Sequence, residues 1–228
     1  IFVFLIKKLG VRTAYGLLVF VALYFFLFSP TNFKAIYSYF RERHGYTAWR
    51  SFWKVYQSYL VFGQTLIDKI AISAGLREQF SYEFDGIDTL KTALAQQKGG
   101  ILISAHVGNF EIAERFFADI DLNFQINLVT ADQEHSAIKD YLESIGQKTS
   151  LKWITLKEDM SHIFEINAAL SANELICFTG DRYVEGMKTL SSDFLGAAAD
   201  FPAGPFLLAS RLGVPVIFVY VMKEGKQH

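Results

Sequence analysis

Short apolar runs alternate with helix-like segments along the chain after Gly75, and this alternation constrains the fold more than any other feature. The short runs are bounded by glycine or polar residues, whereas the segments between them carry apolar residues at three- and four-residue steps. Strands are predicted at 81–84, 101–105, 125–130, 152–155, 175–178 and 214–221, and helices at 88–97, from 109 onward, and at 135–145, 159–170 and 203–212. This order predicts a three-layer α/β fold, in which a largely parallel sheet is flanked by helices.

The N-terminal segment carries no charged residue from Thr13 to Phe33. As a helix it would span about 30 Å, the thickness of the hydrocarbon core of a bilayer, so we expect a transmembrane helix before the α/β fold. Basic residues flank the segment on both sides and do not orient it. They are Lys7, Lys8 and Arg12 before it, and Lys34, Arg41, Arg43 and Arg50 after it. A cleaved signal peptide and a re-entrant or interfacial helix are the alternatives.

A second aromatic segment follows the first. From Thr47 to about Ile70 the apolar residues recur mostly at helical spacing, which predicts an amphipathic helix with Thr47 as its N-cap. Its Trp and Tyr side chains suit a bilayer interface, where the ring is buried and the polar atom stays hydrated. Packing against the α/β domain is an equal alternative, and both can hold for different faces of the helix.

Composition favours contact with a membrane and argues against nucleic acid. Hydrophobic residues make up 51% of the chain and aromatic residues 16%, and the net charge of −1 gives no basic field. Cys177 is the single cysteine and lies in the predicted strand 175–178, so we expect no internal disulfide and a reducing compartment. A buried lone cysteine behaves as a small hydrophobe, so we expect no nucleophilic role for it. No metal-ligand motif is present, and we expect neither metal nor cofactor.

His106 is the first candidate catalytic residue. It falls between the predicted strand 101–105 and the helix that begins after it, and Glu111 follows five positions later. On one continuous helix the two side chains would point about 140° apart, but a turn at Gly108 allows the carboxylate to reach one imidazole nitrogen. A histidine oriented in this way can act as a general base. A histidine that only hydrogen-bonds its turn is the commoner reading of an arbitrary His-x4-Glu spacing.

Asp181 and Arg182 follow the apolar strand 175–178 after Gly180. If the strands are parallel, this cluster and His106 lie at the same edge of the sheet, where ligands bind in open α/β folds. Arg182 could bind a phosphate or a carboxylate, while Asp181 holds Arg182 or contacts a substrate hydroxyl. A salt-bridged turn is the alternative.

Residues 106–111, His-Val-Gly-Asn-Phe-Glu, resemble the His-x-Gly-Asn-aromatic-Glu signature of the bacterial lipid A biosynthesis acyltransferases. That family is part of the glycerolipid acyltransferase superfamily, which carries a His-x4-Asp/Glu dyad. The resemblance runs from about Phe84 to the strand after Pro205. Residues 180–182 look like the family's second block, and 194–196 with 201–205 look like its third, where backbone amides near Gly204 could meet an anionic group. Ala203 stands where the broader superfamily carries Glu, so we do not expect this chain to bind its acceptor in the way the broader superfamily does.

The resemblance implies a membrane-anchored bacterial acyltransferase, with His106 as base, Glu111 as its orienting partner, and Gly108 and Asn109 lining the site. The implied donor is acyl carrier protein or acyl-CoA, and the implied acceptor is a hydroxyl or amine of a lipid, first of all a lipid A precursor. The implied location is the bacterial inner membrane, with the catalytic domain facing the cytoplasm. We expect an anchor at 1–34, an aromatic amphipathic segment at 35–75 and a catalytic domain at 76–228, whose last residues look like a loop cut short. The residues alone support only a polar His/Glu site near a membrane, which leaves a hydrolase and a non-enzymatic lipid-binding protein open.

Overall fold

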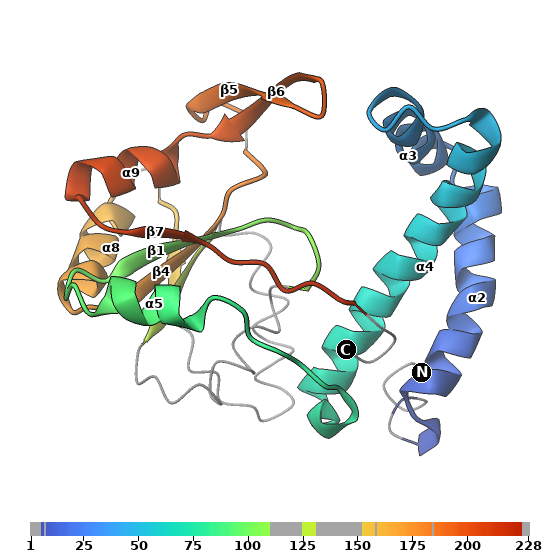
Figure 1. Ribbon diagram of the computed structural model, residues 1–228, viewed down its shortest axis with the longest axis horizontal. Coiled ribbons are helices and arrows are strands. Elements are labelled where there is room, and N and C mark those ends of the chain that lie inside the picture. The colour runs from blue at the N-terminus through green and yellow to red at the C-terminus, as the bar shows by residue number, and fades with distance from the viewer. Residues whose placement is uncertain are drawn as a thin grey trace. The chain divides into compact units, whose positions relative to one another are not determined.

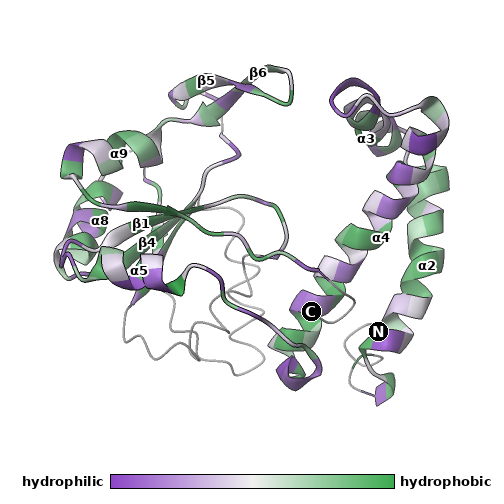
Figure 2. Cartoon of the chain, in the orientation of Figure 1, coloured by the Kyte–Doolittle hydropathy of each residue, from purple (hydrophilic) through white to green (hydrophobic). Residues whose placement is uncertain are grey.

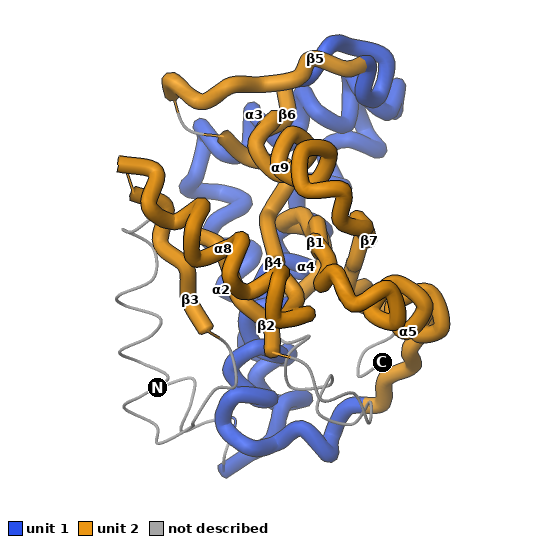
Figure 3. Tube along the Cα trace, turned by 90° about the vertical axis from the view of Figure 1, so that its left-hand side faces the viewer, with its two compact units in different colours: residues 1–80, 193–199 blue, residues 81–192, 200–228 orange. Residues whose placement is uncertain are grey.

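The computed structural model describes residues 6, 8–109, 125–130, 152–157, 159–183 and 185–224. The chain divides into two compact units, one formed by 1–80 with 193–199 and the other by 81–192 with 200–228 (Figure 3). Glu111 and the helices predicted from 109 onward and at 135–145 lie outside the described residues. The division of the sequence at 34 and 75 stays a prediction.

Up to residue 80, the described part of the first unit consists mainly of helices (Figure 1). They are α2 (Val11–Phe28), α3 (Pro30–Glu42), α4 (Ala48–Ser73) and the short 3-10 helix η1 (Arg77–Gln79). Among the described residues, α2 is the one helix long and apolar enough to cross a membrane, and Figure 2 shows hydrophobic residues along most of it. The helix ends at Phe28, before the uncharged segment does, because Pro30 lacks an N–H group and its fixed φ suits the first turn of α3.

The predicted amphipathic helix is confirmed as α4, which runs three residues further than expected, to Ser73. Thr47 caps it as predicted, since its side-chain oxygen accepts the backbone N–H of Arg50 at 3.3 Å. One side of α4 packs against α2, and the buried residues of that contact are Val11, Ala14, Leu18, Ile67 and Ala71, with Ile6 at its edge.

The second unit contains a five-stranded sheet in the order β3-β2-β4-β1-β7, and every neighbouring pair is parallel. Its strands are β1 (Gly100–Ser104), β2 (Ile126–Thr130), β3 (Lys152–Thr155), β4 (Leu175–Thr179) and β7 (Val216–Phe218). The α/β class and the parallel sheet predicted from the sequence are therefore confirmed. β7 is shorter than the predicted strand 214–221, although Val219 still donates its N–H to the carbonyl of Ile103 at 3.0 Å.

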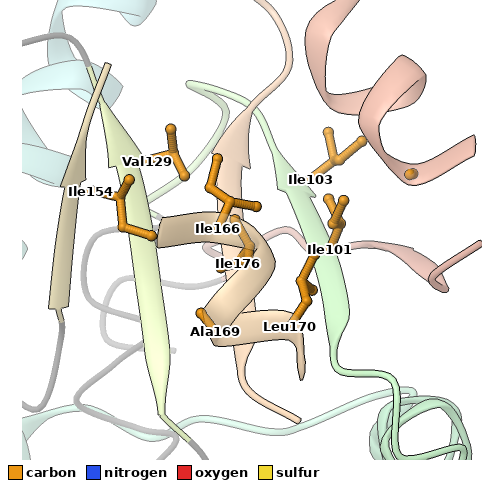
Figure 4. Close-up of a cluster of buried hydrophobic side chains, with 9 residues drawn as sticks. Ile101, Ile103, Val129, Ile154, Ile166, Ala169, Leu170 and Ile176 are labelled. Atoms are coloured by element: carbon orange, nitrogen blue, oxygen red, sulfur yellow. The ribbon is translucent and has the colours of Figure 1, made fainter. Parts of the chain in front are cut away.

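Helices cover both faces of this sheet. On one face, α8 (His162–Ser171) and α9 (Gly204–Leu212) bury alternate strand residues in a core drawn in Figure 4. Its strand members are Ile101, Ile103, Val129, Ile154 and Ile176. On the opposite face, Leu102 and Leu175 pack with α5 (Ile87–Leu94) through Leu90 and Leu94. Each fully buried Leu or Ile stabilises the folded protein by about 1.5–3 kcal/mol. Because successive strand residues point to opposite faces of the sheet, a shift of one residue in any strand would move its apolar side chains out of the cores. Burial on both faces therefore fixes the strand register together with the three layers.

Two local predictions differ from the structure. Residues 81–84 form no strand, and Tyr82 and Phe84 remain exposed, so the two apolar residues of this segment are not buried by a neighbouring strand. The helix predicted at 88–97 is α5, which begins one residue earlier, with Gly86 at the capping position with φ 76°, and ends at Leu94. Asp88 lies in the first turn of α5, where a carboxylate interacts favourably with the helix dipole.

The stretch 183–204, for which the sequence predicted no strand, contains a two-stranded sheet of β5 (Thr189–Phe194) and β6 (Ala197–Pro202). Leu195 and Gly196 connect the strands with φ of 53° and 75°, the paired positive values of a tight hairpin turn. The hairpin could not be predicted from the sequence because most of β5 is exposed and polar, so its apolar residues do not alternate regularly.

Candidate functional site

Strand register brings His106 and Asp181 together. β1 and β4 are neighbouring parallel strands in which Ser104 lies opposite Thr179. The ladder continues past both strands, because the N–H of Gly180 donates to the carbonyl of Ser104 at 2.8 Å. His106 and Asp181 are each the second residue beyond that last pair, so the same register places them side by side at the carboxyl edge of the sheet.

The carboxylate of Asp181 contacts His106 at two places. Its Oδ2 accepts the backbone N–H of His106 at 3.0 Å. Its Oδ1 and Oδ2 lie 3.0 and 3.2 Å from Nδ1 of the ring. A carboxylate at this nitrogen favours the tautomer that carries its proton on Nδ1, which leaves the lone pair on Nε2.

Both side chains remain open to solvent, with 31% of His106 and 28% of Asp181 exposed. The imidazole is therefore fixed by its partner and still accessible from outside the protein. This combination suits a residue that exchanges a proton with a bound substrate.

The loop after His106 is held by the chain that continues from β7. The N–H of Asn109 donates to the carbonyl of Val221 at 2.9 Å. Gly108 has φ 71°, and a Cβ there would lie 1.9 Å from the same carbonyl oxygen. Glycine is therefore required by the close approach of two backbones, and the Asn109 N–H is already used in positioning the loop.

The other predicted site residues lie at different places. Arg182 follows Asp181 directly and is exposed, and within the described part of the chain it makes no hydrogen bond or ion pair. Gly204 is the first residue of α9, with open space where a side chain would stand. Glu111 lies outside the described residues. The roles predicted for these residues stay predictions, as do those of His106, Gly108, Asn109 and Asp181.

The contact between Asp181 and His106 was not predicted, although both residues were expected at one edge of the sheet. In the structure each residue lies two positions beyond the end of its strand, but the predicted runs 101–105 and 175–178 do not show this equal spacing, and using it also requires knowing that the two strands are neighbours. Val221 was missed altogether, because it contributes through its backbone carbonyl and its side chain gives no hint of that.

Ser104 and Cys177, which carry groups that can act as nucleophiles in other enzymes, lie inside strands. Ser104 is the last residue of β1 and only 3% exposed. Cys177 lies in the middle of β4, and burial raises the pKa of its thiol to about 12. A thiol with that pKa is protonated at neutral pH and is a poor nucleophile.

Comparisons with known proteins show the family of the chain. The family model described as bacterial lipid A biosynthesis acyltransferase matches residues 54–228, a stretch that includes the His106 loop and Asp181. The chain is also similar to a phosphatidylinositol mannoside acyltransferase of Mycobacterium tuberculosis (strain ATCC 25618 / H37Rv), with 25% identity over 154 residues. That alignment covers 66% of this chain and 47% of the relative, so the chain spans about half the length of the curated relative that it matches. Since the family match extends over most of the chain, the protein belongs to the bacterial lipid A biosynthesis acyltransferase family.

Proposed function

We propose that this protein transfers a fatty acyl chain from a thioester to a hydroxyl or amine of a lipid at a membrane. The observation that carries the proposal is the contact of the Asp181 carboxylate with Nδ1 of an accessible His106. Family membership and the acyltransferase relative support acyl transfer as the reaction class. The apolar helix α2 supports action at a membrane.

In the proposed reaction, Nε2 of His106 takes the proton of the acceptor as the acceptor oxygen or nitrogen attacks the thioester carbonyl. The new bond to the acyl carbon forms, the carbon–sulfur bond breaks, and the imidazolium returns its proton to the departing thiolate. Asp181 stabilises the imidazolium between these steps. A thioester is already activated, so direct transfer needs no covalent acyl-enzyme.

The remaining assignments follow the sequence. Acyl carrier protein or acyl-CoA is the proposed donor, and a lipid A precursor or a related lipid is the proposed acceptor. Arg182 and the amides around Gly204 are proposed to bind anionic groups of these substrates, and Gly108 and Asn109 to shape the loop beside the reacting atoms. Glu111 is proposed, as in the sequence motif, to orient His106 and support its imidazolium. The proposed location is the bacterial inner membrane, with the catalytic unit facing the cytoplasm.

The test is an incubation of the full chain in detergent with acyl carrier protein or CoA thioesters and a lipid extract of its host, read by mass spectrometry. We expect one lipid to gain the mass of an acyl chain. His106→Ala should lower the rate by at least about 10²-fold, within the range of general acid–base catalysis. His162→Ala is the matched control, because His162 begins α8 and belongs to no strand end at the site.

Release of free fatty acid without any acylated lipid would replace the proposal by a hydrolase. A folded His106→Ala protein with the wild-type rate, or an acylated side chain trapped during turnover, would overturn the direct mechanism. Absence of both products from every thioester and lipid extract would favour a non-enzymatic lipid-binding protein.

A further inference from the structure

The apolar helix α2 is paired with α4 along its whole length. At one end Val11 and Ala14 pack with Ile67 and Ala71. In the middle the helices approach so closely that a Cβ at Gly63 would lie 2.2 Å from Cδ1 of Leu18. At the other end the rings of Phe26 and Phe52 are 5.0 Å apart, centroid to centroid. Wherever α2 lies in a membrane, α4 must therefore lie beside it.

α4 is poorly suited to cross a bilayer. Its longest stretch without charge runs from 55 to 67, which as a helix spans about 20 Å, compared with about 30 Å for the hydrocarbon core. Lys54 and Asp68 bound this stretch, and Gln57 and Gln64 lie within it. A Lys or Asp deep in a membrane costs about 2.5–3.5 kcal/mol on insertion scales, and among the described helices α2 alone meets the criteria for a membrane span.

Asp68 is held inside the pair and cannot simply turn outward. It is 5% exposed, and its Oδ1 accepts a hydrogen bond from the hydroxyl of Tyr15. Tyr15 belongs to the uncharged segment that was expected to span the bilayer. The contact thus fixes a carboxyl group of α4 at the level of that segment.

The outer surface of the pair is nevertheless apolar. Phe20, Tyr24, Leu27 and Phe28 of α2 are 59–70% exposed, and Val61 and Phe62 of α4 are 53% and 63% exposed. Neighbouring exposed apolar side chains of this kind are typical of a surface that contacts lipid or another protein.

The end of the pair where α3 joins α2 to α4 has the chemistry of a lipid headgroup region. Trp49 and Trp53 are 71% and 49% exposed. From 29 to 54 the charged residues are Lys34, Arg41, Glu42, Arg43, Arg50 and Lys54, so five of the six are basic. Exposed Trp side chains among basic residues favour the surface of a membrane that contains anionic lipids.

We propose that α2 and α4 enter one leaflet of an anionic bilayer together, as a hairpin lying along the membrane surface, and that α2 does not cross the bilayer. The exposed apolar side chains then contact the acyl chains of that leaflet. Both charged ends of α4 stay at headgroup depth, which the short uncharged stretch of α4 permits. The proposal concerns membrane topology and does not depend on the proposed acyl transfer.

The test uses single cysteines in the full chain. Cys177→Ala removes the one native thiol. One new cysteine is then introduced at a time, each at an exposed position: Lys8→Cys before α2, His44→Cys after α3 and Lys91→Cys on α5. Each protein is expressed in a bacterium and treated with a membrane-impermeant maleimide in spheroplasts and in inverted membrane vesicles. Detergent-solubilised membranes give the full labelling signal.

We expect all three cysteines to be labelled in the same preparation and none in the other. Labelling of Lys8→Cys from one face, and of both His44→Cys and Lys91→Cys from the other, would overturn the proposal, because α2 would then cross the bilayer alone. Labelling of His44→Cys from the face opposite to both other cysteines would overturn it in another way, since both helices would cross. A His44→Cys thiol that reacts only in detergent, or a protein that does not sediment with membranes, would also contradict it.

Discussion

At the residue scale, Asp181 is the group whose contact most clearly serves His106, since it meets both the backbone N–H and Nδ1. Asp181→Asn keeps the size and a hydrogen-bonding oxygen but removes the negative charge. The imidazolium formed during transfer then loses its counter-charge, so we expect kcat to fall by at least about tenfold with KM for the thioester little changed. Steady-state kinetics of the purified full chain measure both quantities.

Asp85→Asn is the matched control, because Asp85 is an exposed carboxylate in an irregular segment of the same unit. Its kcat should equal that of the unmodified protein. A folded Asp181→Asn protein that also keeps its full kcat would show that the charge of Asp181 is not needed. Glu111→Gln would then be the next substitution to measure.

A second prediction at the residue scale concerns Gly108. It distinguishes the cost of a positive φ from the cost of a clash with a neighbouring backbone. Gly108 and Gly186 both have positive φ, 71° and 88°. A Cβ at Gly108 would meet the carbonyl oxygen of Val221, whereas a Cβ at Gly186 would meet nothing within 4 Å. Gly186→Ala should cost about 1 kcal/mol through strain alone, and Gly108→Ala should cost more and displace the His106 loop.

Thermal unfolding and acyl-transfer rate measure the two effects separately. We expect Gly108→Ala to lower activity at temperatures where the protein is still folded, while Gly186→Ala lowers only the unfolding temperature. Equal behaviour of the two variants would mean that the contact with Val221 does not position the loop.

At the scale of elements, the sequence predicted best where burial was strong. β1, β2, β3 and β4 match their predicted runs to within one residue at each end, because continuous apolar residues are needed to bury both faces of a parallel sheet. The same reasoning failed for 81–84, where two apolar residues stay exposed, and for the hairpin β5–β6, whose first strand is mostly polar.

Strand order was not predictable in the same way. His106 and Asp181 were expected at one edge of the sheet, but their contact requires β1 and β4 to be neighbours. Neighbouring strands in a parallel sheet are chosen by the crossover connections, and no local pattern in either strand encodes that choice. The candidate site residues could thus be nominated from the sequence, whereas the partner on Nδ1 of His106 could be identified only in the folded chain.

The pairing of α2 with α4 gives a prediction at the same scale. Gly63→Leu places a side chain where Leu18 now packs, so the helices must move apart and the contact of Ile67 with α2 is weakened. We expect a loss of about 1–3 kcal/mol in stability, as for other overpacked cores. Gly16→Ala is the control, because Gly16 is exposed on α2 with open space around it, and alanine favours the helix by about 1 kcal/mol.

Thermal unfolding in detergent should therefore move in opposite directions for the two variants. A Gly63→Leu protein as stable as the unmodified chain would mean that the close approach of α2 and α4 contributes little to the fold. Cysteine labelling of the same variant then reports whether its membrane topology is also unchanged.

At the scale of the whole molecule, removing α2 and making its outer surface polar should have different consequences. Deleting residues 1–34 strips α2 from α4 and exposes Ile67 and Ala71, which are 4% and 0% exposed in the intact protein. Membrane attachment should weaken, but the newly exposed apolar side of α4 should cause aggregation, so the shortened protein should not become a stable monomer.

The triple variant Phe20→Gln, Leu27→Gln, Phe62→Gln leaves the contact between the helices intact, because these side chains are 61–70% exposed. A fully buried Phe or Leu contributes about 1.5–3 kcal/mol, so the three changes should remove several kcal/mol of binding to lipid without unfolding the protein. What attachment remains should come from the basic residues between α2 and α4, and about 1 M salt should release it, because added ions screen contacts with anionic headgroups. Sedimentation with membranes at low and high salt, together with size-exclusion chromatography of the released protein, measures each effect. Retention of the triple variant on membranes at high salt to the same extent as the unmodified chain would show that the outer surface of α2 and α4 is not what binds the bilayer.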